Sequence, residues 1–364
     1  PEDSRTEKTL SFSVYRYQYM LTVLVTGAGG SIGTNMIRGL DKWDRSVEII
    51  GTEVNKYYYH LSRADETYRI PAASDKRYFD RLSEIIDHES VDVVLPSNGW
   101  EVQAISQHSG DVPAATALPQ GDVVTLFQNK WKLCRALTGT DTPTPETRLI
   151  EDQSDIEAAM TEIPTDDVWV RGIGIKGYPG RKMRNRDRIA DWIDYHDGWG
   201  TSTISTYLSG ADLTWLGIFD QGTLICSQGR QRLDYGSSQS WGTGAPTVSR
   251  TIHRDDVNEL GKRSIEAVDE NPHGVYFTDF RADDDGVPRV TEVNPGRLGT
   301  TSSAFYSRAG LNLTALLVQV ALEETYDTPQ TVNALPADLH YISKPSCDPV
   351  IVSREELGSN GVET

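Results

Sequence analysis

Short apolar runs alternate with amphipathic segments over the first third of the chain. Leu21–Thr26, Val47–Val54 and Val91–Leu95 are apolar or β-branched almost throughout and have the length of buried strands. Between the first two runs, apolar residues return at helical spacing, at Ile32, Met36, Ile37 and Leu40. Continuous apolar strands separated by amphipathic helices are typical of a parallel sheet that is covered on both faces. We therefore predict an α/β domain over residues 21–125.

From residue 126 onward the pattern changes to mixed helices and antiparallel strands, which predicts a second domain over residues 126–330. We expect helices at 129–137, near 189–193, at 255–268 and at 311–322, a strand at 168–170, an antiparallel pair turning at 220–222, and a hairpin of 275–281 with 289–293. Residues 1–20 are expected to be a flexible extension, with Met20 a candidate native start, and residues 331–364 a partly ordered tail.

The composition is that of an acidic globular protein. Of the 364 residues, 37% are hydrophobic, and the formal net charge is −18. No apolar run approaches the roughly 18 residues that span a bilayer, and the charge repels phosphate backbones and anionic lipids. Nucleic acids and membranes are therefore not expected as partners.

Aspartate carries most of the acidity, and lysine is rare beside arginine, with 32 Asp, 21 Glu, 10 Lys and 25 Arg. This bias favours adaptation to a high-salt cytoplasm, where screening relieves self-repulsion, although an ordinary acidic protein has a similar charge. The three cysteines, Cys134, Cys226 and Cys347, show no paired spacing for zinc or a redox motif. We expect a cytoplasmic protein.

A first glycine cluster, Gly27 to Gly33, follows the first predicted strand and opens a helix. Its amides could hold a pyrophosphate, and Glu53, some 20 residues on, could bind a ribose. That pattern is the fingerprint of NAD(P)-dependent nucleotide-sugar epimerases and dehydrogenases, which also need a Tyr-x-x-x-Lys pair. Here the pair is matched only by Tyr178 and Lys182, in a loop. Such a turn also occurs for purely structural reasons, so an oxidoreductase stays an alternative.

A second glycine cluster follows the strand that ends at Arg171. Gly174, Gly177 and Gly180 recur at three-residue intervals, with Lys176, Arg181 and Lys182 interleaved. The amides and cations of such a loop can close over triphosphate oxygens. A mobile surface hairpin is the alternative interpretation.

The third cluster is an acidic hairpin. Asp279 lies on one strand, and Glu292 and Asn294 lie two residues apart on the other, so all three can reach one face. Three oxygen-bearing side chains suit Mg²⁺, or Mn²⁺, which keeps positions open for phosphate and water. Arg297 places a guanidinium just beyond this predicted metal site. Asp283, Asp284 and Asp285 lie at the tip of the hairpin and are expected to be a solvated turn.

The hairpin resembles the C-terminal signature of the ATP-grasp ligases, with carbamoyl-phosphate synthetase large-subunit-like and carboxylate-amine ligase-like members closest. The likeness rests on Gly274-Val275-Tyr276-Phe277-Thr278-Asp279-Phe280, Asp285-Gly286, Thr291-Glu292-Val293-Asn294-Pro295-Gly296-Arg297 and Gly310-Leu311-Asn312. Upstream, Lys130 with Thr142-Pro143-Thr144-Pro145 resembles the lysine that opens the fold and its usual sequel. The likeness covers about residues 21–325 in the family's order.

The resemblance implies a Rossmann-like pre-ATP-grasp domain, with no need for NAD, followed by an ATP-grasp fold of two α+β subdomains. It implies that Lys130 and Arg171 neutralise the phosphates of ATP. It also implies that the backbone of Tyr207 and Leu208 contacts adenine and that Asp212 contacts ribose. Two departures stand out: Thr206 replaces a frequent hinge glutamate, and Gly296 shifts the arginine of the usual Asn-Pro-Arg to Arg297.

The sequence thus predicts an ATP-dependent ligase, of the carboxylate-amine or carboxylate-thiol type, that activates a carboxylate as an acyl phosphate. The resemblance implies ATP and Mg²⁺ as cofactors, with Asp279, Glu292 and Asn294 on the metal, and small-molecule carboxylate and amine substrates. Arg297 and Arg232 are the candidates to hold the acyl phosphate or substrate carboxylate. An ATP-binding module without turnover is a further alternative, and a homodimer is one candidate assembly.

Overall fold

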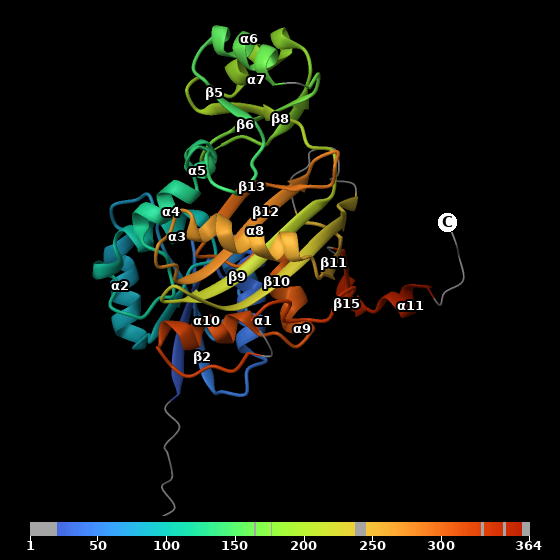
Figure 1. Ribbon diagram of the computed structural model, residues 1–364. Coiled ribbons are helices and arrows are strands. Elements are labelled where there is room, and N and C mark those ends of the chain that lie inside the picture. The colour runs from blue at the N-terminus through green and yellow to red at the C-terminus, as the bar shows by residue number, and fades with distance from the viewer. Residues whose placement is uncertain are drawn as a thin grey trace, which may run out of the picture.

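The computed structural model describes residues 20–163, 165–175, 177–236, 245–328, 331–344 and 347–358, with only the backbone at Thr300 and Cys347. Within these residues the strands form three sheets, one of four parallel strands and two antiparallel sheets of four and seven strands. Figure 1 shows the seven-stranded sheet in the middle of the molecule and the small antiparallel sheet at one end. The mixed α/β and α+β architecture predicted from the sequence is confirmed.

The amino-terminal unit is a parallel sheet in the order β3-β2-β1-β4. Its elements are β1 (Leu21–Thr26), α1 (Ser31–Leu40), β2 (Val47–Glu53), η1 (Tyr58–Leu61), β3 (Glu66–Arg69), α2 (Tyr78–Glu89), β4 (Val93–Leu95), α3 (Gly99–Gln107), η2 (Ser109–Asp111) and α4 (Gly121–Phe127). β1 is buried at every position because both faces of the sheet are covered, with Val23 in one hydrophobic cluster and Leu24 in another, as its continuous apolar run predicted. The division from the rest of the chain at residue 125 stays a prediction.

A small antiparallel sheet in the order β5-β8-β6-β7 forms the next unit, which we call the lid. It comprises β5 (Thr147–Ile150), α6 (Gln153–Glu162), β6 (Val168–Gly172), β7 (Arg181–Met183), α7 (Arg186–Tyr195) and β8 (Ser202–Thr206), and it follows α5 (Lys130–Leu137), which packs in the core of the large sheet through Leu133 and Leu137. α6 and α7 pack on one face of the sheet through a core that includes Ile156, Ile189 and Ile204. The other face is left to the site described below.

The large sheet has the order β13-β12-β9-β10-β11-β14-β15. Its unit contains β9 (Asp212–Asp220), β10 (Thr223–Asp234), β11 (Val248–Ile252), α8 (Asp255–Glu266), β12 (Gly274–Ala282), β13 (Pro288–Pro295), α9 (Thr300–Arg308), α10 (Leu313–Ala321), β14 (His340–Lys344), β15 (Cys347–Val352) and α11 (Arg354–Gly358). The expectation of a tail over 331–364 is wrong where the structure describes it, because β14 pairs with β11 and β15 extends the same sheet.

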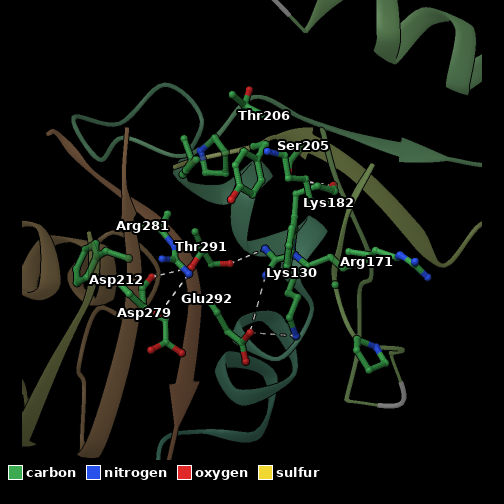
Figure 2. A pocket seen from close by; sticks show the side chains of 18 of the residues that line it. Lys130, Arg171, Lys182, Ser205, Thr206, Asp212, Asp279, Arg281, Thr291 and Glu292 are labelled. Carbon is green, nitrogen blue, oxygen red and sulfur yellow. Dashed lines mark hydrogen bonds and ion pairs between the residues drawn. The ribbon is translucent and has the colours of Figure 1, made fainter. Parts of the chain in front are cut away.

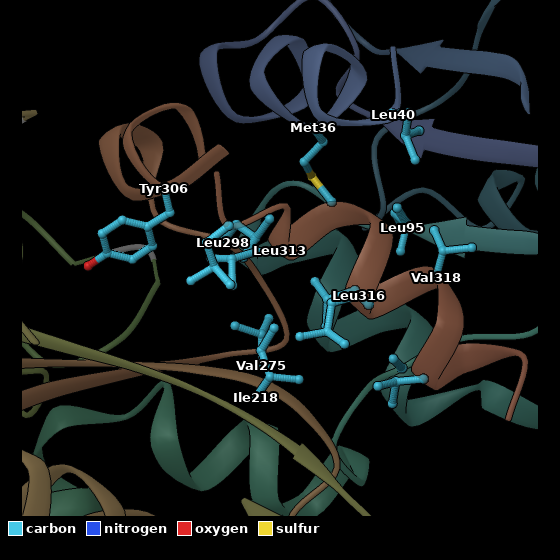
Figure 3. Close-up of a cluster of buried hydrophobic side chains, with 14 of the residues drawn as sticks. Met36, Leu40, Leu95, Ile218, Val275, Leu298, Tyr306, Leu313, Leu316 and Val318 are labelled. Atoms are coloured by element: carbon cyan, nitrogen blue, oxygen red, sulfur yellow. The ribbon is translucent and has the colours of Figure 1, made fainter. Parts of the chain in front are cut away.

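One hydrophobic core joins the amino-terminal unit to the large sheet. Met36 of α1 and Leu316 of α10 pack with Ile218 of β9 and Val275 of β12 in a single buried cluster, part of which is drawn in Figure 3. Fully burying one such side chain contributes about 1.5–3 kcal/mol. The shared core therefore holds the two units together, and the lid projects from them.

In the part of the chain that the structure describes, every helix is too short or too polar to cross a lipid bilayer.

Candidate active site

A cavity of about 1020 Å³ lies between the lid and the large sheet. The residues predicted from the sequence that line it are Lys130, Arg171, Gly174, Gly177, Gly180, Tyr207, Leu208, Asp212, Arg232, Asp279 and Glu292. Asn294 and Arg297 are adjacent to Glu292, and Lys176 lies outside the described residues. Segments that are far apart in the sequence therefore meet in one place, as the predicted site requires.

Two cations converge on Glu292, as Figure 2 shows. Lys130 opens α5, where the side chain of Asn129 caps the helix and the Lys130 amide donates to the carbonyl of Ile173 at 2.8 Å. Its Nζ lies 3.4 Å from Glu292, and a guanidinium nitrogen of Arg171, at the end of β6, lies 3.9 Å from the same oxygen. The site therefore holds two positive groups that are only partly neutralised.

Two carboxylates face each other across the β12–β13 pair, with Asp279 directly opposite Glu292. Burial raises the pKa of Asp279 to about 6, with the charge of Glu292 adding to the effect. Burial also acts to raise the pKa of Glu292, but Lys130, Arg171 and Arg297 outweigh it and hold that pKa low. One member of the pair is therefore firmly ionised, and the other ionises only as the pH rises toward neutrality.

Asp212 is an internal ion-pair partner in this structure. One of its oxygens lies 3.3 Å from Arg232, and the other accepts from the Tyr235 hydroxyl and lies 3.2 Å from Arg281. The contact with ribose that the resemblance implies stays a prediction. Arg232 also donates to Asp279 at 2.6 Å, so it links the two aspartates.

The loop after β6 is tightly folded at its start. A Cβ atom on Gly172 would lie 2.6 Å from the Cα of Gly177, so the two segments approach more closely than side chains allow. Tyr178 then turns into the lid, where its hydroxyl donates to Ser202 at 2.7 Å and its ring stacks on His196. Gly172 and Gly177 are therefore required by the packing of the loop itself.

An aromatic and cationic wall completes the cavity on the lid side, and of its members only Trp169 was not predicted from the sequence. Trp169 lies 6.3 Å from the ring of Tyr207, and Lys182 lies over that ring at 4.3 Å. A signal was present, because Trp169 and Arg171 are two residues apart on β6 and alternate with buried Val168 and Val170. Lys182, on β7, is one of the cations that the second glycine cluster already indicated.

Gly296 explains the shifted arginine. Its φ is +71°, and a Cβ there would lie 2.7 Å from Val102 of α3, so glycine is needed where β13 leaves the sheet. The chain still brings Arg297 back, since its guanidinium donates to Asn294 at 2.5 Å and lowers the pKa of Glu292. Thr206, the other departure, lines the cavity and donates its amide to the carbonyl of Glu146 at 2.9 Å.

The donor set fits a small divalent cation without forming a complete cage. Glu292 and Asp279 supply carboxylate oxygens from neighbouring strands, and Asn294 supplies an amide oxygen beside them. The described residues contain no group of three His, Cys, Asp or Glu suited to a metal. Two carboxylates and an amide suit Mg²⁺, which takes few protein ligands and completes its shell with phosphate and water. The residues present therefore fit the predicted ion.

The glycine turn of the amino-terminal unit is closed on itself. The amide of Ala28 donates to Thr52, that of Gly29 to the carboxylate of Glu53 at 3.2 Å, and that of Gly30 to Gly27. These are the groups that a pyrophosphate would need. Glu53, the predicted ribose ligand, instead occupies the turn. The structure therefore gives the oxidoreductase alternative no support.

Glu101 lies beside this turn and gives the chain a pH-sensitive buried carboxyl. Burial raises its pKa to about 7 from an ordinary 4.5, although hydrogen bonds from Thr26 and Asn98 favour the ionised form. The folded protein therefore holds this proton more tightly than the unfolded chain. The stabilisation is present at low pH and is lost as the pH rises from about 4.5 through 7.

Glu101→Gln should remove this pH dependence. The unfolding free energy of the variant, minus that of the wild type, should grow by about 2–3 kcal/mol between pH 5 and pH 8 because only the wild type pays for ionisation. Urea unfolding at four pH values measures it. Glu84→Gln, at an exposed position, is the matched control and should show a flat difference. A flat difference for Glu101→Gln as well would contradict the raised pKa.

Solved structures with similar folds come from several enzymes, some of them crystallised with ATP or ADP. Carboxyaminoimidazole ribonucleotide synthase from Aspergillus clavatus, complexed with ATP, aligns with a TM-score of 0.67 at 13% identity, covering 89% of this chain and 81% of that one. The biotin carboxylase domain of 2-oxoglutarate carboxylase from Hydrogenobacter thermophilus, with MgADP, ADP and bicarbonate, gives 0.69 at 14%, covering 89% and 74%. L-amino acid ligase from Bacillus licheniformis gives 0.66 at 13%, covering 88% and 78%.

The fold is therefore that of the ATP-grasp ligases, and the resemblance predicted from the sequence is confirmed at the level of the fold. More particularly, residues 23–116 match the family described as PylC-like, N-terminal domain. No curated protein matches the sequence significantly.

Proposed function

We propose that this chain is an ATP-dependent ligase that activates a carboxylate as an acyl phosphate for attack by an amine. The observation that carries the proposal is the convergence of Lys130 and Arg171 on Glu292, opposite Asp279, in a cavity roofed by a glycine-rich loop. Paired cations beside paired carboxylates are what a metal-bound triphosphate needs. The similar enzymes crystallised with ATP or MgADP support the same assignment.

In this proposal Lys130 and Arg171 leave Glu292 and neutralise the phosphates, while Asp279, Glu292 and Asn294 would hold Mg²⁺. When bound there, the metal would offset phosphate charge and orient the γ-phosphoryl group. The substrate carboxylate oxygen attacks the γ-phosphorus, ADP leaves, and the amine then displaces phosphate from the acyl carbon. Gly174, Gly177 and Gly180, which line the cavity, would keep water from the acyl phosphate, and Arg297 would hold its oxygens.

The proposal also covers the nucleophile, the location, the assembly and the salt adaptation of the protein. An amine is favoured over a thiol as nucleophile because L-amino acid ligase is among the similar structures. The protein would act in the cytoplasm on small molecules. We propose a homodimer by analogy with the biotin carboxylase domain, which was crystallised as a dimer. The aspartate bias supports adaptation to high salt.

A thermal-shift experiment separates the proposed classes. Mg-ATP at a hundred times its Kd should stabilise the protein by about 2.7 kcal/mol, whereas NAD should give no shift. Lys130→Met should lose most of the Mg-ATP shift, and Lys132→Met, at an exposed position two residues away, should keep it. A shift with NAD and none with Mg-ATP would refute the ligase proposal.

Turnover is tested by phosphate release from a panel of carboxylates crossed with amines in strong KCl. ADP and phosphate should appear only with a matching acid and amine. A Mg-ATP shift with no release across a broad panel would instead favour an ATP-binding module without turnover.

A further inference from the structure

Arg230 on β10 is a buried cation with no buried anion of its own. Its side chain is 1% exposed. Its Nε donates to the Thr214 hydroxyl at 3.2 Å, and another guanidinium nitrogen donates to the hydroxyl of Thr301. Among the described residues, no carboxylate forms an ion pair with it. Its neighbour on the same strand, Arg232, by contrast pairs with both Asp212 and Asp279.

Such an arrangement is costly in the absence of a ligand. Taking a guanidinium out of water without an ionic partner is strongly unfavourable, and burial accordingly lowers the pKa of Arg230. The ring of Phe277, 5.7 Å from the guanidinium carbon, and the two hydroxyls offset only part of this cost. A counter-anion would remove the rest of it.

Two buried hydroxyl groups on elements next to β10 have no hydrogen-bond partner among the described residues. Tyr306, on α9, is buried, and its hydroxyl has no hydrogen-bond partner among the described residues. Burial raises the pKa of this hydroxyl to about 12, although the charge of Arg230 opposes the rise. Figure 3 shows this hydroxyl pointing away from the hydrophobic cluster. Ser249, on β11 and opposite Arg232, is also buried with an unpartnered hydroxyl. Thr301 lies in the first turn of α9, whose cap residue Gly299 offers no side-chain acceptor.

The position is next to the proposed chemistry. Thr214 on β9 lies opposite Arg230 on one side and opposite Asp279 on the other. Arg230 is therefore two strand spacings, about 10 Å, from the proposed metal ligand. That distance suits a second functional group on a small substrate.

We propose that Arg230, with Thr301 and Tyr306, forms a subsite for an anionic group, a carboxylate or a phosphate, carried by the substrate. The identification of that anion as part of a substrate rests on the proposed ligase function. The subsite limits the substrates to those with a second negative group beyond the reacting carboxylate. Arg230 is a specificity-determining residue in this proposal.

The stability of the ligand-free protein is the first test. If Arg230 is kept for a ligand, Arg230→Met should have a melting temperature equal to or above that of the wild type, since it removes an unpaired buried charge. If Arg230 only ties α9 to the sheet, the variant should melt well below the wild type or fail to fold, and the proposal would be overturned.

Anion binding is the second test, and it is made in a Lys130→Met background because Lys130 would also attract phosphate. Sodium phosphate or sodium acetate, against sodium chloride at equal ionic strength, should raise the melting temperature of Lys130→Met by about 2 °C or more. The rise should vanish in Lys130→Met/Arg230→Met. In the same Lys130→Met background, the rise should persist with Arg230→Lys, which keeps the positive charge. It should also persist with Arg250→Met, because the Arg250 guanidinium pairs with Asp338.

A rise with acetate alone assigns a carboxylate, and a rise with phosphate alone assigns a phosphoryl group. No rise, or an equal rise after Arg230→Met, would overturn the subsite. Because no nucleotide is present, the outcome is independent of the Mg-ATP shift. A failed Mg-ATP experiment with a positive anion experiment would therefore refute the ligase proposal alone.

Discussion

Glu292→Gln should lower the rate of ADP formation by about a thousandfold or more, while the protein remains folded. The substitution keeps the shape of the side chain and removes its charge. Lys130, Arg171 and Arg297 hold the pKa of Glu292 low despite its burial, so the wild-type side chain is ionised at every working pH. Loss of an electrostatic partner at this position should therefore cost at least as much as loss of one oxyanion-hole donor, about 10²–10³-fold.

The variant should also change which nucleotide species binds. Without the Glu292 charge, Lys130 and Arg171 keep their full positive charge toward phosphates, so affinity for metal-free ATP should be retained or increased. The gain in affinity on adding Mg²⁺ should disappear. Calorimetric titration with ATP, with and without Mg²⁺, measures both effects.

Glu266→Gln is the matched control, because Glu266, on the surface of α8, pairs only with Lys262 among the residues that the structure describes, and the variant should keep full turnover. Wild-type turnover in Glu292→Gln would contradict the proposed metal site. An unchanged Mg²⁺ dependence of nucleotide binding would do the same.

The parts of the fold that could be predicted from sequence are those where one residue pattern permits one structure. β1 is a continuous apolar run and proved to be a fully buried central strand. In the sequence, two strand patterns flank an Asp-Gly turn. In the structure, they form the β12–β13 hairpin with Asp279 opposite Glu292. In both cases local pattern and tertiary environment agree.

The parts that could not be predicted depend on partners distant in the sequence. β14 contains His340 and Lys344 and looks like a polar tail, yet it pairs with β11 because that edge of the sheet is open to it. α9 is rich in threonine and serine, which are poor helix formers, and it is held by burial against the large sheet.

The site shows the same division. The motif order predicted which residues would line the cavity, but not how they pair without a ligand. Asp212 was expected to be open to a ribose, whereas Arg281, its direct partner across the β9–β12 pair, and Tyr235 engage it. Pairing of this kind is set by strand register, which the spacing of residues along the chain does not reveal.

Arg232→Met should be among the most destabilising single substitutions in the site, lowering the unfolding free energy by about 3–5 kcal/mol at pH 7.5. Arg232 is 17% exposed, and its partners Asp212 and Asp279 are 9% and 18% exposed. Removing Arg232 leaves the charge of Asp279 without its partner. Burial raises the pKa of Asp279, and the charge of Arg232 opposes that rise. Arg250→Met, which breaks a half-exposed pair with Asp338, should cost less than about 1 kcal/mol.

A second substitution tests whether the stranded charge is the cause. Arg232→Met/Asp279→Asn removes that charge, so the double variant should lose less stability than the sum of the two single losses, by about 1–3 kcal/mol. The loss in Arg232→Met alone should also shrink toward pH 5, because Asp279 then takes up a proton and no longer needs a partner. Urea unfolding of the four proteins at pH 5 and pH 7.5 measures both effects. Strict additivity with no pH dependence would mean that Arg232 stabilises the fold by packing rather than by holding the carboxylates in place.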